Sequence, residues 1–104
     1  MTPLARTTDP DTSHDAAASI AATVARQEAM IYAVLCDCGP RHAEGVAEEI
    51  CERYSWQPDS IAVCRRFRDM ERRGLIRYAG YSRPNHNGRR ARAMEAIQTD
   101  RAAA

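Results

Sequence analysis

Arginine is the residue type whose number and spacing in this sequence most clearly indicate chemistry, and that chemistry is the binding of anions. Residues 59–92 contain ten arginines and three acidic residues, a net charge of +7. Residues 1–58 contain four arginines and nine acidic residues, a net charge of −5. Lysine is absent, so every fixed cation is a forked guanidinium that can hold a phosphate or a guanine at two points. This separation of charge predicts a polyanionic partner for residues 59–92.

A solvated helix face is the alternative interpretation of the same arginines. Arg65 and Asp69 lie four residues apart, a spacing at which opposite charges pair along a helix. Residues 80–90, however, contain three arginines and no acidic residue of their own. This basic loop therefore favours an external anion over internal pairing.

Residues 59–73 are predicted to form the helix that positions the first group of arginines. Asp59 or Ser60 can cap its start, and Gly74 can end it. Apolar positions at i, i+4 and i+7 form one stripe, which consists of Val63, Phe67 and Met70. At about 100° per residue, the opposite side carries Ala62, Arg65, Asp69 and Arg72, with Arg66 and Arg68 on the flanks.

A basic β-hairpin is predicted to follow this helix. Leu75 and Ile76 begin a short strand, and residues 80–90 form a polar loop interrupted by glycine and proline. A return strand then runs from Arg90 to about Ala96. The order of helix, Gly-Leu-Ile and basic hairpin places two groups of arginines next to each other.

Earlier helices must support this arrangement. Residues 24–37 carry one apolar face and end at Gly39-Pro40, and residues 43–54 form a second helix. Thr12 or Ser13 can cap a further helical segment at the N-terminal end. The helix over residues 43–54 also has an acidic face, which we expect to point away from any polyanion, and its members are Glu44, Glu48 and Glu52.

The pattern Phe67-Arg68-x-Met70-x-x-x-Gly74-Leu75-Ile76, followed by a basic hairpin, resembles the recognition helix and wing of winged helix-turn-helix DNA-binding proteins. The resemblance covers about residues 23–97 and is to the small versions found in bacteriophages and prophages. Residues 11–20 are similar to a Thr-Ser-x-x-Ala-Ala-x-x-Ile lead of those proteins. The resemblance implies a double-stranded DNA-binding protein of the bacterial cytoplasm, either a transcriptional regulator or a replication or recombination accessory factor.

The fold class that follows is mainly α with a small β-hairpin, namely a three-helix core plus wing with an extra N-terminal helix. We expect residues 1–11 to be a disordered tail, residues 12–97 the winged helix-turn-helix domain and residues 98–104 a frayed tail. The resemblance favours a break near Thr23, although the residues alone leave one helix or two open over 12–38. A homodimer through the N-terminal helices is compatible with paired DNA half-sites.

The resemblance also assigns roles to individual side chains. The recognition helix would enter the major groove, where Arg65 could pair with guanine. Arginines later in the helix would bind phosphate, and the hairpin would contact the backbone or minor groove. The predicted DNA-binding residues are Ser60, Ala62, Arg65, Arg66, Arg68, Arg72, Arg73, Arg83, His86, Asn87, Arg89 and Arg90.

Other functions find less support in the sequence. A protein-interaction module is the main rival, with the acidic helix 43–54 as its working surface and a host protein as its partner; a structured-RNA binder is another. The spacing of Cys36, Cys38, Cys51 and Cys64 matches no recurrent zinc pattern, so we expect no metal and no cofactor. The three histidines lack an evident nucleophile or acid partner, and we expect no enzyme. No apolar run is long enough to predict a membrane segment.

Overall fold

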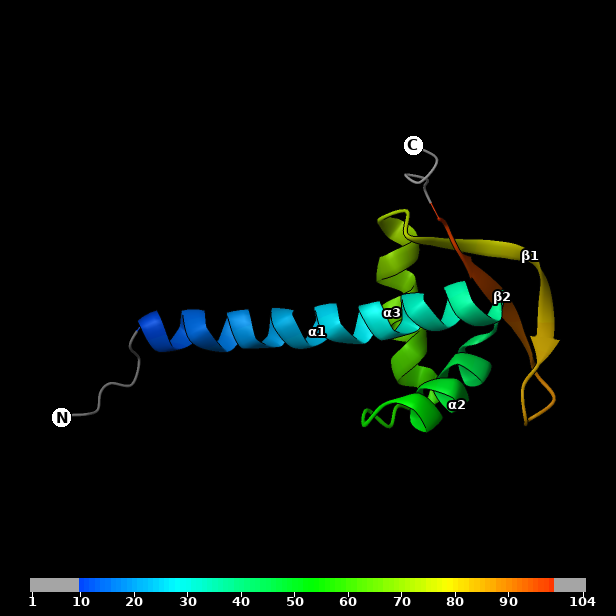
Figure 1. Cartoon of the computed structure of the whole chain (residues 1–104), viewed down its shortest axis with the longest axis horizontal. Helices are drawn as coiled ribbons and strands as arrows, with labels where there is room; N and C mark the ends of the chain where they lie inside the picture. The colour runs from blue at the N-terminus through cyan, green and yellow to red at the C-terminus, as the bar shows by residue number, and fades with distance from the viewer. Residues whose placement is uncertain (1–9, 99–104) are drawn as a thin grey trace.

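Three helices precede a two-stranded antiparallel hairpin in the computed structural model, which describes residues 10–98 and the side chains of residues 19–98. The helices are α1 (Pro10–Cys38), α2 (Ala43–Arg53) and α3 (Ser60–Arg72), and the strands are β1 (Ile76–Pro84) and β2 (Arg90–Ala96). In Figure 1, α1 lies across α3, and the hairpin lies beside the C-terminal end of α1. The prediction of a mainly helical chain with a small hairpin is confirmed.

Every element contributes apolar side chains to one core. Val63 and Met70 of α3 have no exposed surface, and Phe67 is 7% exposed, so the predicted buried stripe is confirmed. Burying an aliphatic or aromatic side chain of this size stabilises a fold by about 1.5–3 kcal/mol. The remaining core members with less than 4% exposure are Ile31, Val34, Leu35, Val46, Ile50, Ile76, Ala93 and Met94.

Both ends of α3 form as their residue types predict. The side chain of Asp59 accepts a hydrogen bond from the Ala62 backbone N–H at 2.9 Å, which satisfies one of the free donors at the helix start. Gly74 has a φ of +80°, and the Leu75 N–H donates to the Met70 carbonyl at 2.9 Å. These contacts make a glycine-terminated helix end, in which the left-handed residue needs no Cβ. The direction of the chain from α3 into β1 is therefore set locally.

Residues 12–38, which the sequence left open as one helix or two, lie in the single helix α1. The break near Thr23 that the resemblance favoured is absent: Thr23 lies within the helix, where its hydroxyl donates to the Ser19 carbonyl at 3.0 Å, and the many alanines around it favour an unbroken helix. The helix also begins at Pro10, inside the segment expected to be disordered; proline suits a first helical position because its missing N–H is not needed there. The rest of the predicted tails, residues 1–9 and 99–104, lies outside the described residues.

The hairpin contains an irregularity on β1 that changes its direction. Tyr78 lies opposite Met94, whereas Ser82, four residues later, lies opposite Arg92, only two residues earlier on β2. The additional residues form a bulge at Gly80, whose φ is +99°. Figure 1 shows that β1 turns sharply partway along its length. The strand therefore continues to Pro84, and the loop is narrower than the predicted 80–90.

The segment between α1 and α2 is also tied to the hairpin. The Arg41 N–H donates to the Met94 carbonyl at 3.0 Å, and the Met94 N–H donates to the Arg41 carbonyl at 2.9 Å. This bridge adds a third backbone segment beside β2. It holds the hairpin against the helices from which the candidate site is built.

Candidate nucleic-acid interface

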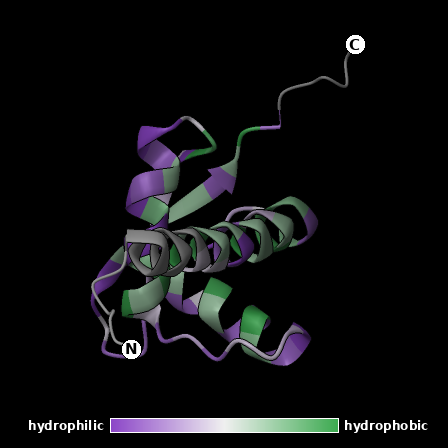
Figure 2. Ribbon diagram, turned by 90° about the vertical axis from the view of Figure 1, so that its left-hand side faces the viewer, coloured by the Kyte–Doolittle hydropathy of each residue, from purple (hydrophilic) through white to green (hydrophobic). Residues whose placement is uncertain are grey.

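A ridge of exposed side chains runs along α3 on the side away from the core. Ile61 is 62% exposed, and exposed arginines follow it at intervals of four, three and four residues. These intervals place the side chains above one another on a helix. We call this surface the α3 ridge; it consists of Ile61, Arg65, Arg68 and Arg72. Much of α3 is purple in Figure 2, at the hydrophilic end of its scale.

The α3 ridge differs from the predicted outer face at two positions. Arg68 lies on the ridge, although it was expected on a flank, and Ala62 is half-buried, although it was expected to face outward. The Ala62 backbone N–H is bound by Asp59. The difference arises because the centre of the buried stripe lies between Val63 and Phe67, so the point opposite falls between Arg65 and Arg68.

Two arginines of the α3 ridge have no acidic partner among the described residues. Asp69 pairs with Arg72 at 3.1 Å and leaves Arg65 free, so the expected pairing of Arg65 with Asp69 is not formed. Arg65 and Arg68 are exposed guanidinium groups available to an external anion. This result disfavours the interpretation of α3 as a self-neutralised helix face.

The opposite flank of α3 is turned toward α1. Arg73 forms an ion pair with Glu28 of α1, whose side chain is 11% exposed. This carboxylate raises the pKa of the Arg73 guanidinium. Arg66, two helical turns before Arg73, lies on the same flank and is half-buried. Both residues were predicted to bind DNA, but Arg73 has a positioning role that fixes α3 on α1.

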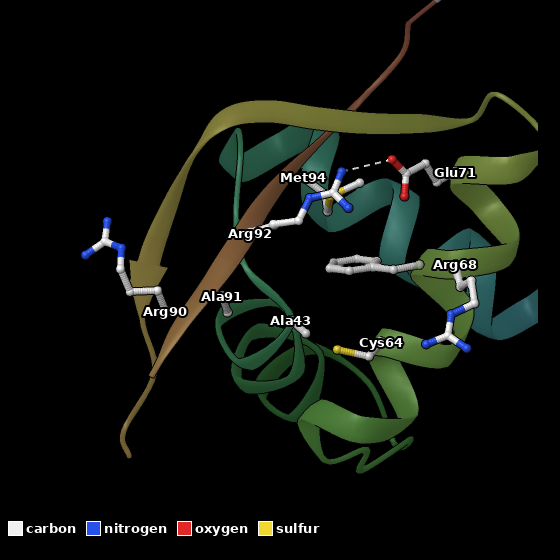
Figure 3. Close-up of a pocket in the computed structure, with 9 residues that line it drawn as sticks. Ala43, Cys64, Arg68, Glu71, Arg90, Ala91, Arg92 and Met94 are labelled. Atoms are coloured by element: carbon white, nitrogen blue, oxygen red, sulfur yellow. Dashed lines mark hydrogen bonds and ion pairs between the residues drawn. The ribbon is translucent and has the colours of Figure 1, made fainter. Parts of the chain in front are cut away.

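A cleft of about 380 Å³ separates α3 from β2. Arg68 lies on the α3 side and Arg90 on the β2 side, as Figure 3 shows. The side chains between them include Ala43, Phe67 and Met94, which are mostly apolar. The two arginines, 22 positions apart in the chain, thus flank the cleft, and Figure 3 shows that the Arg90 guanidinium points away from it.

Arg92 is the residue of this cleft that the sequence analysis missed. Its guanidinium donates to the Glu71 carboxylate at 3.0 Å and lies 4.5 Å from the centre of the Tyr78 ring. Figure 3 shows this bond joining β2 to α3. Arg92 belongs to the basic segment. The sequence does not show which side chains of β2 face α3, because the bulge at Gly80 shifts the pairing of the two strands.

The hairpin loop is ordered by Asn85 and attached to α2 by His86. The Asn85 side chain accepts from the backbone N–H groups of Asn87 at 3.0 Å and Arg89 at 3.1 Å. The His86 N–H donates to Glu44 at 2.9 Å, and the His86 ring forms a second contact with the same carboxylate. These bonds lower the pKa of Glu44. His86, predicted to bind DNA, is thus used to hold the loop on α2.

The arginines in and beside the hairpin loop form no ion pair with a described carboxylate. Arg83 lies 5.4 Å from the centre of the Tyr81 ring, and Arg90 donates to the Ser82 carbonyl at 2.8 Å. Neither these two nor Arg89 has a carboxylate partner within residues 19–98, and all three are exposed. The hairpin therefore presents three cations that no described carboxylate neutralises.

The acidic side of α2 is closer to this surface than predicted. Glu44, Glu48 and Glu52 line a hollow that also includes Asp59, Ser60 and His86. The expectation that all three glutamates point away is wrong for Glu44, because His86 of the hairpin loop reaches it. Ser60, a predicted contact, consequently lies beside carboxylates, which makes it a poor position for a phosphate.

The cysteines are dispersed over the helices. Cys36, Cys38 and Cys51 are half-buried, and Cys64 is exposed at the cleft. Partial burial raises the pKa of the Cys64 thiol, against a smaller opposing effect of Arg68. Within the part of the chain searched, no three histidine, cysteine or acidic side chains gather as a metal site would require.

Comparison with known proteins finds no protein-family model, no curated protein and no solved structure that matches this chain. Among the helices of the described region, none combines the length and apolar character needed to cross a membrane.

Proposed function

We propose that this chain is a winged helix-turn-helix protein that binds double-stranded DNA. The observation that carries the proposal is two groups of exposed arginines without an acidic partner among residues 19–98, Arg65 and Arg68 on the α3 ridge and Arg83, Arg89 and Arg90 on the hairpin. Arginines without an acidic partner in the protein are available to bind DNA phosphates, and contacts of this kind supply most of protein–DNA affinity.

The arrangement of the backbone supports the winged-helix part of the proposal. The order is helix, a short bridge at Arg41, two helices and a hairpin, and the bridge pairs with β2. In a helix-turn-helix the second helix of the motif, here α3, enters the major groove. The hairpin would then be the wing, next to the same duplex.

Separate roles follow for the two arginine groups. Arg65 would reach a base edge, where a bidentate pair with guanine discriminates by about 1–3 kcal/mol. Ile61 would contact a thymine methyl group. Arg68 on the helix and Arg90 on the hairpin would each hold a phosphate of the DNA backbone. Function would follow from occupation of a DNA site, as in a phage regulator or a replication or recombination accessory factor.

The experiment is a charge reversal measured by fluorescence anisotropy with duplex DNA. Arg65→Glu should weaken binding by about tenfold or more, because it removes a base contact and adds repulsion. Arg26→Glu is the matched control, since Arg26 is an exposed arginine that lies on α1 and not on α3, and its guanidinium donates to the Thr23 hydroxyl. Equal affinities of the two variants would refute the assignment of α3.

A protein-interaction module is the second candidate, and the acidic hollow on α2 supports it. Glu48 and Glu52 are exposed and have no cationic partner in the described part of the chain. Under this proposal Glu48→Arg with Glu52→Arg would abolish capture of a basic host protein, whereas Arg65→Glu would not. Under the DNA-binding proposal, the same double reversal leaves DNA affinity unchanged or raises it.

A further inference from the structure

The cleft between α3 and β2 reaches the apolar core of the protein. Its volume of about 380 Å³ lies within the range of about 300–1,000 Å³ that small-molecule sites occupy. Its most buried lining residues belong to the core cluster, and we call them the apolar floor: Ala43, Phe67 and Met94. A DNA duplex is too wide to enter a space of this size, so the DNA-binding proposal leaves the apolar floor unused.

Three elements of the fold supply the apolar floor. Ala43 is the first residue of α2, Phe67 belongs to α3, and Met94 lies on β2. The Met94 backbone is hydrogen-bonded in both directions to Arg41, and a side-chain bond joins β2 to α3 across the cleft. The protein's own bonds therefore hold the cleft in shape, as in most small-molecule sites.

The charged side chains of the cleft leave one cation over. Among the lining residues Glu71 is the one carboxylate, and it pairs with Arg92. Arg68 has no carboxylate partner among residues 19–98. Burial raises the pKa of the Cys64 thiol in the cleft, and the charge of Arg68 opposes that rise, so this guanidinium acts on the cleft electrostatically. The cleft thus combines an apolar floor with a cation that the described residues do not neutralise.

We propose that the cleft binds a small organic anion with a flat apolar body, of the class of aromatic carboxylates. The carboxylate pairs with the Arg68 guanidinium in a charge-assisted contact that can form two parallel hydrogen bonds. The ring lies on Phe67 and Met94, because aromatic rings pack favourably against a phenyl group and against a thioether sulfur.

Other classes of ligand fit the cleft less well. A cation would be repelled by the guanidinium groups of Arg68 and Arg92. A neutral apolar molecule would remove water from Arg68 without pairing with its charge, which costs free energy. Inorganic phosphate would pair with Arg68 but would leave the apolar floor in contact with water. An anion with an apolar body is the class that uses both parts of the cleft.

This inference does not rest on DNA binding, because the cleft and its ligand involve no nucleic acid. If both proposals hold, they meet at Arg68, to which the DNA-binding proposal assigns a phosphate. The small anion and the DNA then compete for one guanidinium. Binding of the anion in the cleft would consequently lower the affinity for DNA.

Titration of the isotope-labelled full chain with 2-naphthoate, followed by NMR, tests the proposal in the absence of DNA. Binding should saturate with a dissociation constant of about 0.1–1 mM, the range for a ligand of this size, and should shift the backbone amide signals of Cys64, Ala91 and Met94. The matched probe is 2-naphthalenemethanol, which keeps the ring system without the charge. It should bind about tenfold more weakly or worse, because a hydrogen bond between charged groups is lost.

Two variants assign the charge to a residue. Arg68→Gln should weaken binding of 2-naphthoate by about tenfold and leave binding of the uncharged probe unchanged. Arg65→Gln is the matched control, since Arg65 is also an exposed arginine of α3 without an acidic partner among residues 19–98, but it does not line the cleft. It should leave the affinity for both probes unchanged. Thermal unfolding checks that both variants are folded.

Equal affinities for the two probes, or equal effects of the two glutamine variants, would overturn the proposal. It would also be overturned if no signal shifts saturably, or if only amides outside the cleft respond. Inorganic phosphate supplies the last comparison, because binding as tight as that of 2-naphthoate would mean that the apolar floor contributes nothing, and would contradict the proposal. None of these results bears on the DNA-binding proposal, since the titration contains no DNA.

Discussion

Arg92 of β2 donates a hydrogen bond to Glu71 of α3 at 3.0 Å, and this contact joins the hairpin to the helix across the cleft. The two side chains are 54% and 40% exposed, so solvent screens the pair. Its effect on stability is consequently small. Its importance lies in positioning, because it joins the two walls of the cleft between α3 and β2.

Replacing Glu71 with glutamine should lower the free energy of unfolding by only about 0.2–1 kcal/mol, the usual range for an exposed ion pair. Urea denaturation followed by circular dichroism measures this change. Glu52→Gln is the matched control, since Glu52 is exposed and has no partner in residues 19–98. A loss of unfolding free energy much above this range would mean that the Arg92–Glu71 pair stabilises the packing of the hairpin on α3 more than an exposed ion pair usually does.

Arg73→Ala should be more harmful than Arg72→Ala, although the residues are adjacent. Removing Arg73 leaves the Glu28 carboxylate, 11% exposed, without its partner, which costs about 1–3 kcal/mol of stability. Removing Arg72 breaks an exposed pair with Asp69 and costs less than about 1 kcal/mol. Equal losses of unfolding free energy in the two variants would show that the contact with α1 does not stabilise α3.

His86→Ala should raise the pKa of Glu44 toward the ordinary glutamate value of 4.5, because hydrogen bonds from His86 hold it lower. A carboxyl whose folded-state pKa is depressed contributes stability above the unfolded pKa and loses it as pH falls through the folded pKa. The attachment of the hairpin loop to α2 should therefore weaken below about pH 4.5. Titration of the Glu44 carboxyl carbon by NMR, in both proteins, measures the shift. An unchanged pKa in the variant would exclude the contact in solution.

Gly80→Ala tests the bulge that turns β1. The φ of +99° is unfavourable for any residue with a Cβ, although the added methyl group would meet no atom within 4 Å. The expected loss of stability is about 1–2 kcal/mol and comes from the backbone alone. Thermal unfolding measures it. A neutral substitution would show that β1 adopts another path around residue 80.

Local features of the fold could be read from the sequence because short-range chemistry determines them. Asp59 and Gly74 bound α3 as their types predict, and the stripe of Val63, Phe67 and Met70 is buried. The continuity of α1 through Thr23 was not predicted, because the resemblance favoured a break that the alanine-rich residues do not make.

Contacts between distant residues could not be predicted in this way. The ion pair of Arg73 with Glu28 and the attachment of His86 to Glu44 join residues 45 and 42 positions apart. No periodicity in the sequence reveals which arginine will meet an acid across the fold. For this reason the predicted set included Arg73 and His86, which the fold uses internally, and omitted Arg92.

The most direct test of the central claim is the affinity of the full chain for a random duplex DNA, measured by fluorescence anisotropy across a series of salt concentrations. If four or five of the free arginines each neutralise a phosphate, the logarithm of the association constant should fall with the logarithm of salt concentration with a slope of about −3.6 to −4.5. Binding that does not change with salt, or no binding at low salt, would contradict the account.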